Sequence, residues 1–91
     1  MPVTLRLPTV LARNAGGQTV HQAKGATVGD VVADVATRFP DLGPRLRDAK
    51  GEPYPYVIFY LDGEDIRFKE GFATPVPEGA EIVVVPAIAG G

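Results

Sequence analysis

The sequence has no cysteine, no tryptophan and only one histidine, His21, in 91 residues. Without cysteine, the chain can form no disulfide, no thiolate metal site and no cysteine nucleophile. A metal site would need carboxylates alone, because His21 has no second histidine or cysteine to act with it. We therefore expect His21 to be an exposed strand or loop residue, and we assign it no role.

Long hydrophobic runs and a strong charge of one sign are also missing. No run approaches the ~18 apolar residues that span a bilayer, and the start of the chain lacks the pattern of an export signal. Nine Lys and Arg residues against eleven Asp and Glu residues give a net charge of −2. The basic residues are scattered, unlike the basic stripe of a nucleic-acid binder. We expect a cytoplasmic protein with neither nucleic acid nor membrane as a partner.

The composition is that of an ordinary globular domain, with 45% hydrophobic and 22% charged residues. At this length a single core must bury most of the available apolar surface. We predict one domain over residues 1–91, with a C-terminal tail at residues 86–91.

The first part of the chain predicts a hairpin. Val3, Leu5 and Leu7 alternate with polar residues and proline, which is typical of a half-buried strand. Residues 10–17 contain Asn and paired Gly and are predicted to form a loop. A second strand is expected at residues 19–23. No Lys-Ser or Lys-Thr follows the glycines, so a phosphate-binding loop is not expected.

One substantial helix is predicted to follow. Thr27 with Asp30 matches an N-terminal capping pattern, and the residue before Pro40 ends the helix. An apolar stripe at helical spacing indicates a core-facing side; it consists of Val28, Val31, Val32, Val35 and Phe39. Residues 41–48 are expected to add a short helical turn with Leu42 and Leu46 inward, and residues 49–55 to form a loop.

The second half predicts three strands. Residues 56–61 are apolar on both faces, as expected in the middle of a sheet, and Asp62-Gly63 is a strong hairpin signal. A return strand is expected at residues 65–68, and the last strand at residues 81–85, ended by Pro86. Turns are expected at Glu70-Gly71 and Glu78-Gly79.

Together these elements predict an α+β fold. A mixed sheet of four to five strands would pack on one main helix, and the last strand would lie parallel to the first if the two pair. The chain would then leave the fold at a sheet edge.

The sequence ends in two glycines after a small residue, Ala89-Gly90-Gly91. Glycine adopts backbone conformations closed to other residues, so such an end can enter a narrow channel. The terminal carboxyl has a pKa near 3.5 and is an oxyanion at neutral pH, which must be activated before a nucleophile can attack it. Two glycines alone are a weak signal, because chain ends are usually loose.

The chain resembles the ubiquitin-like sulfur carriers of the ThiS and MoaD superfamily over nearly its full length. The resemblance rests on residues 56–68 (YVIFYLDGEDIRF), on Gly71, Ala73-Thr74 and Glu78-Gly79, and on the ending at residues 86–91. Within the superfamily the chain is most similar to the CysO type, through Pro8-Thr9, Gly16-Gly17-Gln18, residues 65–68 and the last three residues. The resemblance implies a β-grasp fold.

The resemblance also implies a chemical cycle. A ubiquitin-activating-type (ThiF/MoeB-like) adenylyltransferase would use ATP to form an acyl-adenylate at Gly91, and a sulfur donor would convert it to a thiocarboxylate. In the CysO type, a pyridoxal-phosphate-dependent cysteine synthase accepts the sulfur, and a metallohydrolase acts on the Gly91 adduct. The carrier would be a co-substrate and not an enzyme. It would have no cofactor of its own, since ATP, pyridoxal phosphate and metal belong to the partners.

The tail residues expected to thread into these enzymes are Ala87, Ile88, Ala89 and Gly90. Phe68, Phe72 and Val85 are candidate docking residues, because apolar side chains at a sheet surface are typical interface anchors. The alternative for the two phenylalanines is a place in the core.

Other functions remain open at this point. The chain could be the small subunit of molybdopterin synthase, or a carrier for thiamin or a secondary metabolite. It could also be a ubiquitin-like modifier joined through Gly91 to lysines on targets, or a plain interaction module. An enzyme is not expected, because no nucleophile and base form a motif. The acidic cluster of Asp62, Glu64 and Asp65 flanks a predicted turn and is interpreted as structural.

Overall fold

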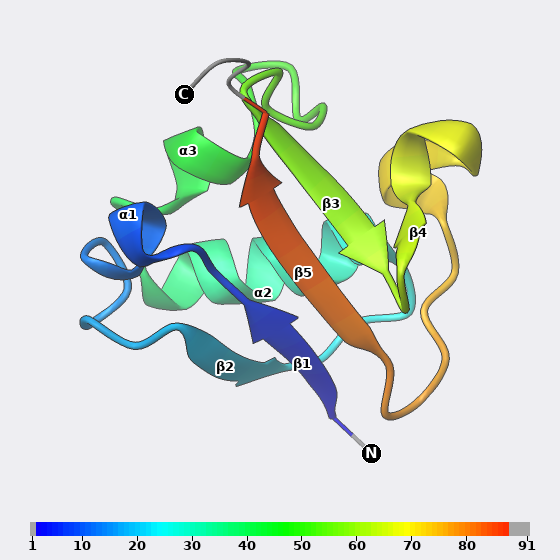
Figure 1. The fold of residues 1–91 in the computed structure, drawn as a ribbon, viewed down its shortest axis with the longest axis horizontal. Coiled ribbons are helices and arrows are strands. Elements are labelled where there is room, and N and C mark those ends of the chain that lie inside the picture. Colours follow the sequence, from blue (N-terminus) through cyan, green and yellow to red (C-terminus); the bar gives the residue numbers. More distant parts are fainter. Residues whose placement is uncertain (1, 88–91) are drawn as a thin grey trace.

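The structure is a computed structural model and describes residues 2–87. Five strands form one mixed sheet in the order β2-β1-β5-β3-β4, and α2 covers one face of it (Figure 1). The strands are β1 (Val3–Arg6), β2 (Val20–Ala23), β3 (Val57–Leu61), β4 (Glu64–Asp65) and β5 (Glu81–Pro86). The helices are α1 (Thr9–Ala12), α2 (Val28–Arg38) and α3 (Gly43–Leu46), with 3₁₀ turns η1 (Ile66–Phe68) and η2 (Gly71–Ala73). The predicted α+β architecture is confirmed.

The hairpin of β1 and β2 is antiparallel, as predicted, with Val3 opposite Ala23 and Arg6 opposite Val20. The segment predicted as a loop between them contains the helical turn α1. The amides of Leu11 and Ala12 both donate to the carbonyl of Pro8, at 2.9 and 3.0 Å. Four residues are too few to show a helical period, which is why the sequence pattern did not reveal this turn.

Helix α2 begins and ends as predicted. The Thr27 hydroxyl accepts a hydrogen bond from the Asp30 amide at 3.2 Å, and Phe39 is the C-terminal cap residue before Pro40. The valine stripe is fully buried, with Val28, Val31, Val32 and Val35 at 0% exposure, while Phe39 packs partly buried against the same core. Valine forms helices poorly, so α2 depends on this packing and on its cap.

Replacing Thr27 by Ala is expected to lower the free energy of unfolding by about 1 kcal/mol, because the Asp30 amide loses its hydrogen-bond acceptor. Thr37→Ala on the same helix is the matched control. The Thr37 side chain is exposed and bonds only the Ala33 carbonyl one turn back, and alanine favours a helix more than threonine does. Urea denaturation of both variants measures the difference, and equal stability of the two would contradict the capping role.

The hairpin predicted at Asp62-Gly63 is present. Both residues have positive φ, 48° and 87°, as the favoured two-residue turn requires. The strand predicted at residues 65–68 is wrong, since β4 has only two residues and Ile66–Phe68 form η1. The Asp65 carboxylate accepts from the Arg67 amide at 2.9 Å. This local bond turns the chain and competes with continued strand pairing.

Strand β5 lies in the middle of the sheet. It pairs parallel with β1, from Thr4 opposite Glu81 to Arg6 opposite Val83, and antiparallel with β3 along its length. The parallel pairing of first and last strands is confirmed. The expected exit at a sheet edge is wrong, because the chain leaves from the end of the central strand.

The last strand also runs one residue further than predicted, since Pro86 pairs with Val57. The Ala87 amide bonds toward β3, on the Tyr56 carbonyl. Alternate residues of a strand bond to opposite sides, so the ring nitrogen of Pro86 faces the β1 side, where the β1 pairing has already ended at Arg6. Its missing N–H therefore costs no ladder bond.

The core lies between α2 and the inner face of the sheet. Leu5, Phe59 and Ile82 from three neighbouring strands are at most 1% exposed. Leu42, the N-cap residue of α3, and Leu46, its last residue, are fully buried as predicted. Among residues 2–87, no helix has the length and apolar character needed to cross a bilayer.

Candidate functional site

The described chain ends at an anchored position. We call Pro86 and Ala87 the tail root. The Ala87 amide donates to the Tyr56 carbonyl at 2.9 Å, and β5 is held by β1 on one side and β3 on the other. The tail root itself is therefore fixed to β3, at the end of the central strand. The predicted threading residue Ala87 is half-buried there; Ile88, Ala89, Gly90 and the predicted modification site Gly91 lie outside the described residues.

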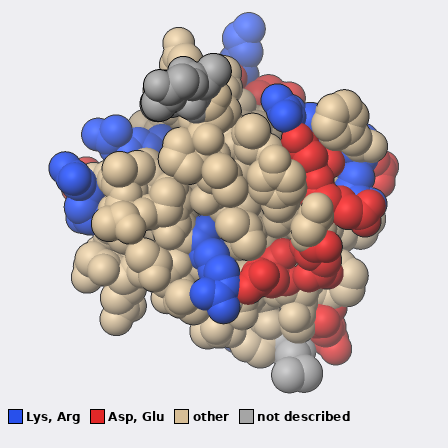
Figure 2. Space-filling view, viewed as in Figure 1, with Lys and Arg blue, Asp and Glu red and all other residues tan. Residues whose placement is uncertain are grey.

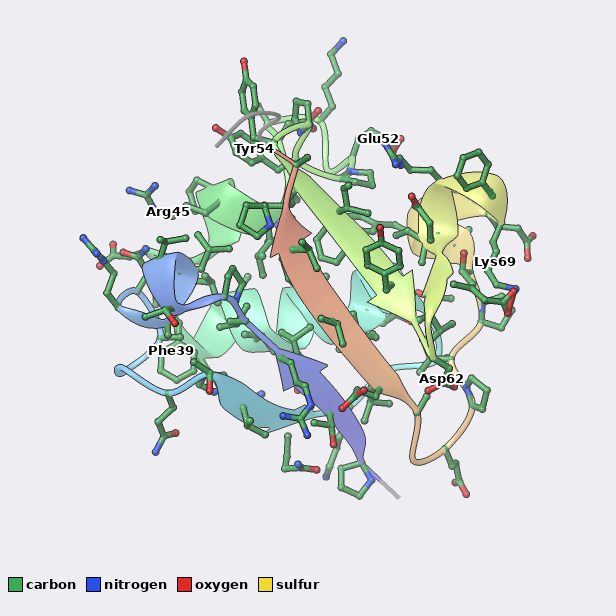
Figure 3. The ribbon with its side chains drawn as sticks, viewed as in Figure 1. Phe39, Arg45, Glu52, Tyr54, Asp62 and Lys69 are labelled. Carbon is green, nitrogen blue, oxygen red and sulfur yellow. The ribbon has the colours of Figure 1, made fainter. Side chains whose placement is uncertain are left out.

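A largely apolar groove of about 630 Å³ opens beside the tail root. Figure 3 shows Arg45 and Tyr54, two of its lining residues, at the end of the sheet where β5 ends. We call it the root groove; its lining residues are Val10, Leu11, Arg45, Tyr54, Tyr56, Val57, Pro86 and Ala87. These come from four separate stretches of the chain, so no local sequence pattern could have predicted the groove.

The face of the sheet opposite α2 carries a second apolar surface. We define the apolar strip as Ile58 and Tyr60 of β3 with Val83 and Val85 of β5. The register places Ile58 opposite Val85 and Tyr60 opposite Val83, and all four residues are half-buried. Figure 2 views this face and shows uncharged side chains at its centre, with most of the charged ones around them. The candidate docking residue Val85 lies within this strip.

The two candidate phenylalanines differ in their surroundings. Phe68 on η1 is 84% exposed, and the Arg67 guanidinium lies 5.9 Å from the centre of its ring. Phe72 on η2 is half-buried, and its ring makes a T-shaped contact with the Phe59 ring at 5.3 Å between centres. Phe68 is therefore outside the core, whereas Phe72 packs partly into it. The docking roles of Phe68, Phe72 and Val85 stay predictions.

The acidic cluster supports the hairpin and η1. Arg67 donates to the Asp65 carboxylate, at 3.0 Å from Nε and 2.7 Å from Nη2. These bonds hold the pKa of the Asp65 carboxyl below its ordinary value and raise the pKa of Arg67. Asp62 accepts from the Glu81 amide at 2.9 Å, and Glu64 pairs with Lys69 at 3.4 Å. All three carboxylates thus have partners within the fold, which agrees with the structural interpretation.

His21 is buried, at 5% exposure, so the expectation of an exposed histidine is wrong. Its Nε2 lies 2.7 Å from the Gln18 carbonyl oxygen, and its ring meets Phe39 edge-on at 5.1 Å between centres. The alternation of β2 places His21 and Ala23 on the inner face. Among residues 2–87, no cluster of three His, Cys, Asp or Glu residues could hold a metal ion.

Comparisons with known proteins agree with this geometry. The ThiS family model matches residues 5–91. The sulfur carrier protein CysO of Mycobacterium tuberculosis is 37% identical over 93 residues, covering all of both chains. The crystal structure of the BexX/CysO complex of Amycolatopsis orientalis contains a similar chain, with a TM-score of 0.90, 35% identity, and coverage of 98% of this chain and 99% of that one.

A ubiquitin-like relative is also similar. Small archaeal modifier protein 3 of Haloferax volcanii is 35% identical over 66 residues, which cover 72% of this chain and 71% of the modifier. The predicted β-grasp fold and the predicted resemblance to CysO-type carriers are confirmed by these comparisons together with the sheet order. The family match covers the last residue, Gly91, as well as the folded body. The chain therefore belongs to the ThiS family.

Proposed function

We propose that this protein is a sulfur carrier whose Gly91 carboxyl is adenylated, converted to a thiocarboxylate and used as a sulfur donor in biosynthesis, namely of cysteine. The observation that carries the proposal is the 37% identity to CysO over the full length of both proteins. The similarity includes the folded body and also the end of the chain, where the chemistry would take place. The anchored tail root supports the proposal, because a tail that starts from a fixed position can be bound by a partner in the same place each time.

Adenylation removes the chemical obstacle at the terminus. A carboxylate is a poor electrophile because it is negatively charged at neutral pH. Its oxygen attacks the α-phosphorus of ATP and pyrophosphate leaves, giving an acyl-adenylate. Hydrosulfide, delivered by the sulfur donor, then attacks the acyl carbon and AMP leaves as the C–O bond breaks, and the product is the thiocarboxylate. These steps take place in a partner's active site, and the carrier supplies the acyl group.

The dimensions of the tail fit this role. Residues 88–91 span at most about 14 Å when extended, so the terminal carboxyl can reach a catalytic centre that the folded body cannot enter. Ala89, Gly90 and Gly91 have the smallest side chains and need only a narrow channel.

We infer three partners for this cycle. A ThiF/MoeB-like adenylyltransferase charges Gly91, a pyridoxal-phosphate-dependent cysteine synthase accepts the sulfur, and a metallohydrolase releases the product from Gly91. The ATP, pyridoxal phosphate and metal belong to these enzymes. The apolar strip and Phe68 offer apolar docking surface. Molybdopterin, thiamin and secondary-metabolite pathways would differ in the acceptor and not in the charging step.

A pyrophosphate-exchange assay tests the charging step. The purified carrier is incubated with the adenylyltransferase from the same organism, ATP and labelled pyrophosphate. We expect label to enter ATP only when the carrier is present, because formation of the acyl-adenylate is reversible until sulfur arrives. Exchange that does not depend on the carrier would contradict the proposal.

A ubiquitin-like modifier is the second candidate, favoured by the 35% identity to a small archaeal modifier protein. In that function the activated Gly91 forms an amide with lysines of other proteins. Immunoblots of extract from the native host distinguish the two. A ladder of heavier species that depends on Gly91 would indicate a modifier, whereas a single free band is expected for a sulfur carrier.

A further inference from the structure

The root groove has an unusually apolar and accessible rim. Among residues 2–87, four large hydrophobic side chains are markedly exposed, and two of them, Val10 at 56% and Tyr56 at 60%, line this groove. The volume of about 630 Å³ is large enough for several side chains of a bound segment. Exposed apolar surface gathered at one concave site is typical of an interaction surface.

The groove also carries one uncompensated positive charge. Arg45 is exposed on α3 and is the one formally charged residue among the described lining residues. Within residues 2–87, its guanidinium makes no hydrogen bond or ion pair. The other arginines near acidic groups are engaged, such as Arg6 with Glu81 and Arg67 with Asp65. Arg45 is therefore available to a carboxylate that comes from outside the described chain.

Next to the groove, one side of β5 loses its neighbour. The register between β1 and β5 ends at Arg6 and Val83. The amide of Leu7 continues the pairing with β2, on the Thr19 carbonyl, and Pro8 then begins the path into α1. Pro8 has no N–H with which to continue the ladder. From Val84 to Pro86, β5 thus pairs only with β3 among the described strands. An extended segment from another protein can lie along such an open side.

We propose that the root groove receives an extended segment of the adenylyltransferase that activates Gly91, with an apolar side chain in the groove and an acidic side chain on Arg45. The inference rests on the proposed function. Activation is the one step that both the sulfur carrier and the modifier require, so its enzyme is the partner common to both. Because Pro86 and Ala87 line the groove, a segment bound there holds the tail root directly.

Steady-state kinetics of pyrophosphate exchange test this placement. With Arg45→Glu, the KM for the carrier is expected to rise about tenfold, because an attraction at the interface becomes a repulsion. The kcat at saturating carrier should change little, since Arg45 takes no part in the chemistry. Val10→Ser is expected to raise the KM several-fold by removing apolar contact area.

Arg47→Glu is the matched control. This variant makes the same change in net charge two residues away. Arg47, however, lines a different hollow, together with Ala36 and Pro40. The KM of Arg47→Glu should therefore stay near that of the wild type. Raising the ionic strength should raise the KM of the wild type and bring it toward that of Arg45→Glu, because salt screens the charge pair. Circular dichroism verifies that each variant is folded.

The outcomes separate this inference from the proposed function. If the wild-type carrier supports no exchange, the proposed function fails. If the wild type supports exchange and Arg45→Glu and Val10→Ser leave the KM unchanged, the proposed function stands and the groove placement is overturned. An equal rise in KM for Arg45→Glu and Arg47→Glu would also overturn the placement, because the effect would then come from the net charge and not from the groove. A lower KM for Arg45→Glu would also overturn it, because an acidic partner side chain at this position predicts weaker binding.

Discussion

A chain that ends at Gly90 is expected to lose adenylation altogether while keeping its fold. Removing one residue moves the terminal carboxyl back by about 3.5 Å along an extended tail. A displacement of 1 Å can reduce a rate by about 100-fold. The terminal carboxylate of the shortened chain therefore cannot attack the α-phosphorus of ATP effectively. Pyrophosphate exchange measures the loss, and thermal unfolding tests whether stability is unchanged.

Gly91→Ala provides the matched control for the truncation. It keeps the length of the tail and the terminal carboxylate, and it adds one methyl group. We expect Gly91→Ala to retain part of the exchange activity. The comparison then separates the effect of a shorter tail from the effect of an added methyl group in the partner's channel. Full charging of the chain that lacks Gly91 would contradict the assignment of the chemistry to this residue.

Phe59→Ala is expected to lower the free energy of unfolding by about 3–5 kcal/mol. The Phe59 side chain is 1% exposed in the core, and its ring makes a T-shaped contact with the Phe72 ring at 5.3 Å between centres. A domain of this length has a total stability of about 5–14 kcal/mol, so this one substitution removes a large share of it. Urea denaturation at 25 °C measures the change.

Phe68→Ala is the same chemical change at an 84% exposed position. Its effect on stability is expected to stay within about 0.5 kcal/mol, because little apolar area is buried there. A large loss of stability at Phe68, or a small one at Phe59, would contradict the described core. If Phe68 docks a partner as predicted, Phe68→Ala raises the KM of the carrier in the exchange assay without this loss of stability.

The elements that the sequence predicted well are those specified by local physical rules. The cap at Thr27 and the valine stripe of α2 follow from helical spacing, and the Asp62-Gly63 hairpin follows from the need for positive φ. The α+β class follows from the order of the elements, whereas the parallel direction of the first and last strands was predicted only on the condition that the two pair. Gly91 could be predicted as the modification site because the resemblance to sulfur carriers extends to the last residue of the chain.

The features that were missed depend on contacts between distant parts of the chain or on very short segments. The central position of β5 depends on pairing with both β1 and β3, which no single segment encodes. His21 is buried because β2 turns that side of the strand toward Phe39, eighteen positions later in the sequence. The return strand predicted at residues 65–68 is wrong because the Asp65 carboxylate accepts a hydrogen bond from the Arg67 amide, and the chain starts η1 instead.

The root groove could not be predicted from the sequence for the same reason: it depends on contacts between distant parts of the chain. Its lining joins α1, α3, the segment before β3 and the tail root, and its free arginine is one of several scattered basic residues in the sequence. Only the fold places Arg45 beside Ala87. The apolar strip was partly anticipated through Val85, but the strand alternation that groups Val85 with Ile58 required the register.

The most direct test of the proposed function is the intact mass of the protein isolated from its native host under conditions that preserve acyl sulfur. Fragmentation of the C-terminal peptide locates any modification. The proposal predicts a fraction of molecules heavier by the difference between a sulfur and an oxygen atom, with the change at Gly91, and this fraction should be lost when the adenylyltransferase gene is deleted. A Gly91 that stays an unmodified carboxyl in the host, and that gains no sulfur on incubation with ATP, the adenylyltransferase and a sulfur donor, would contradict it.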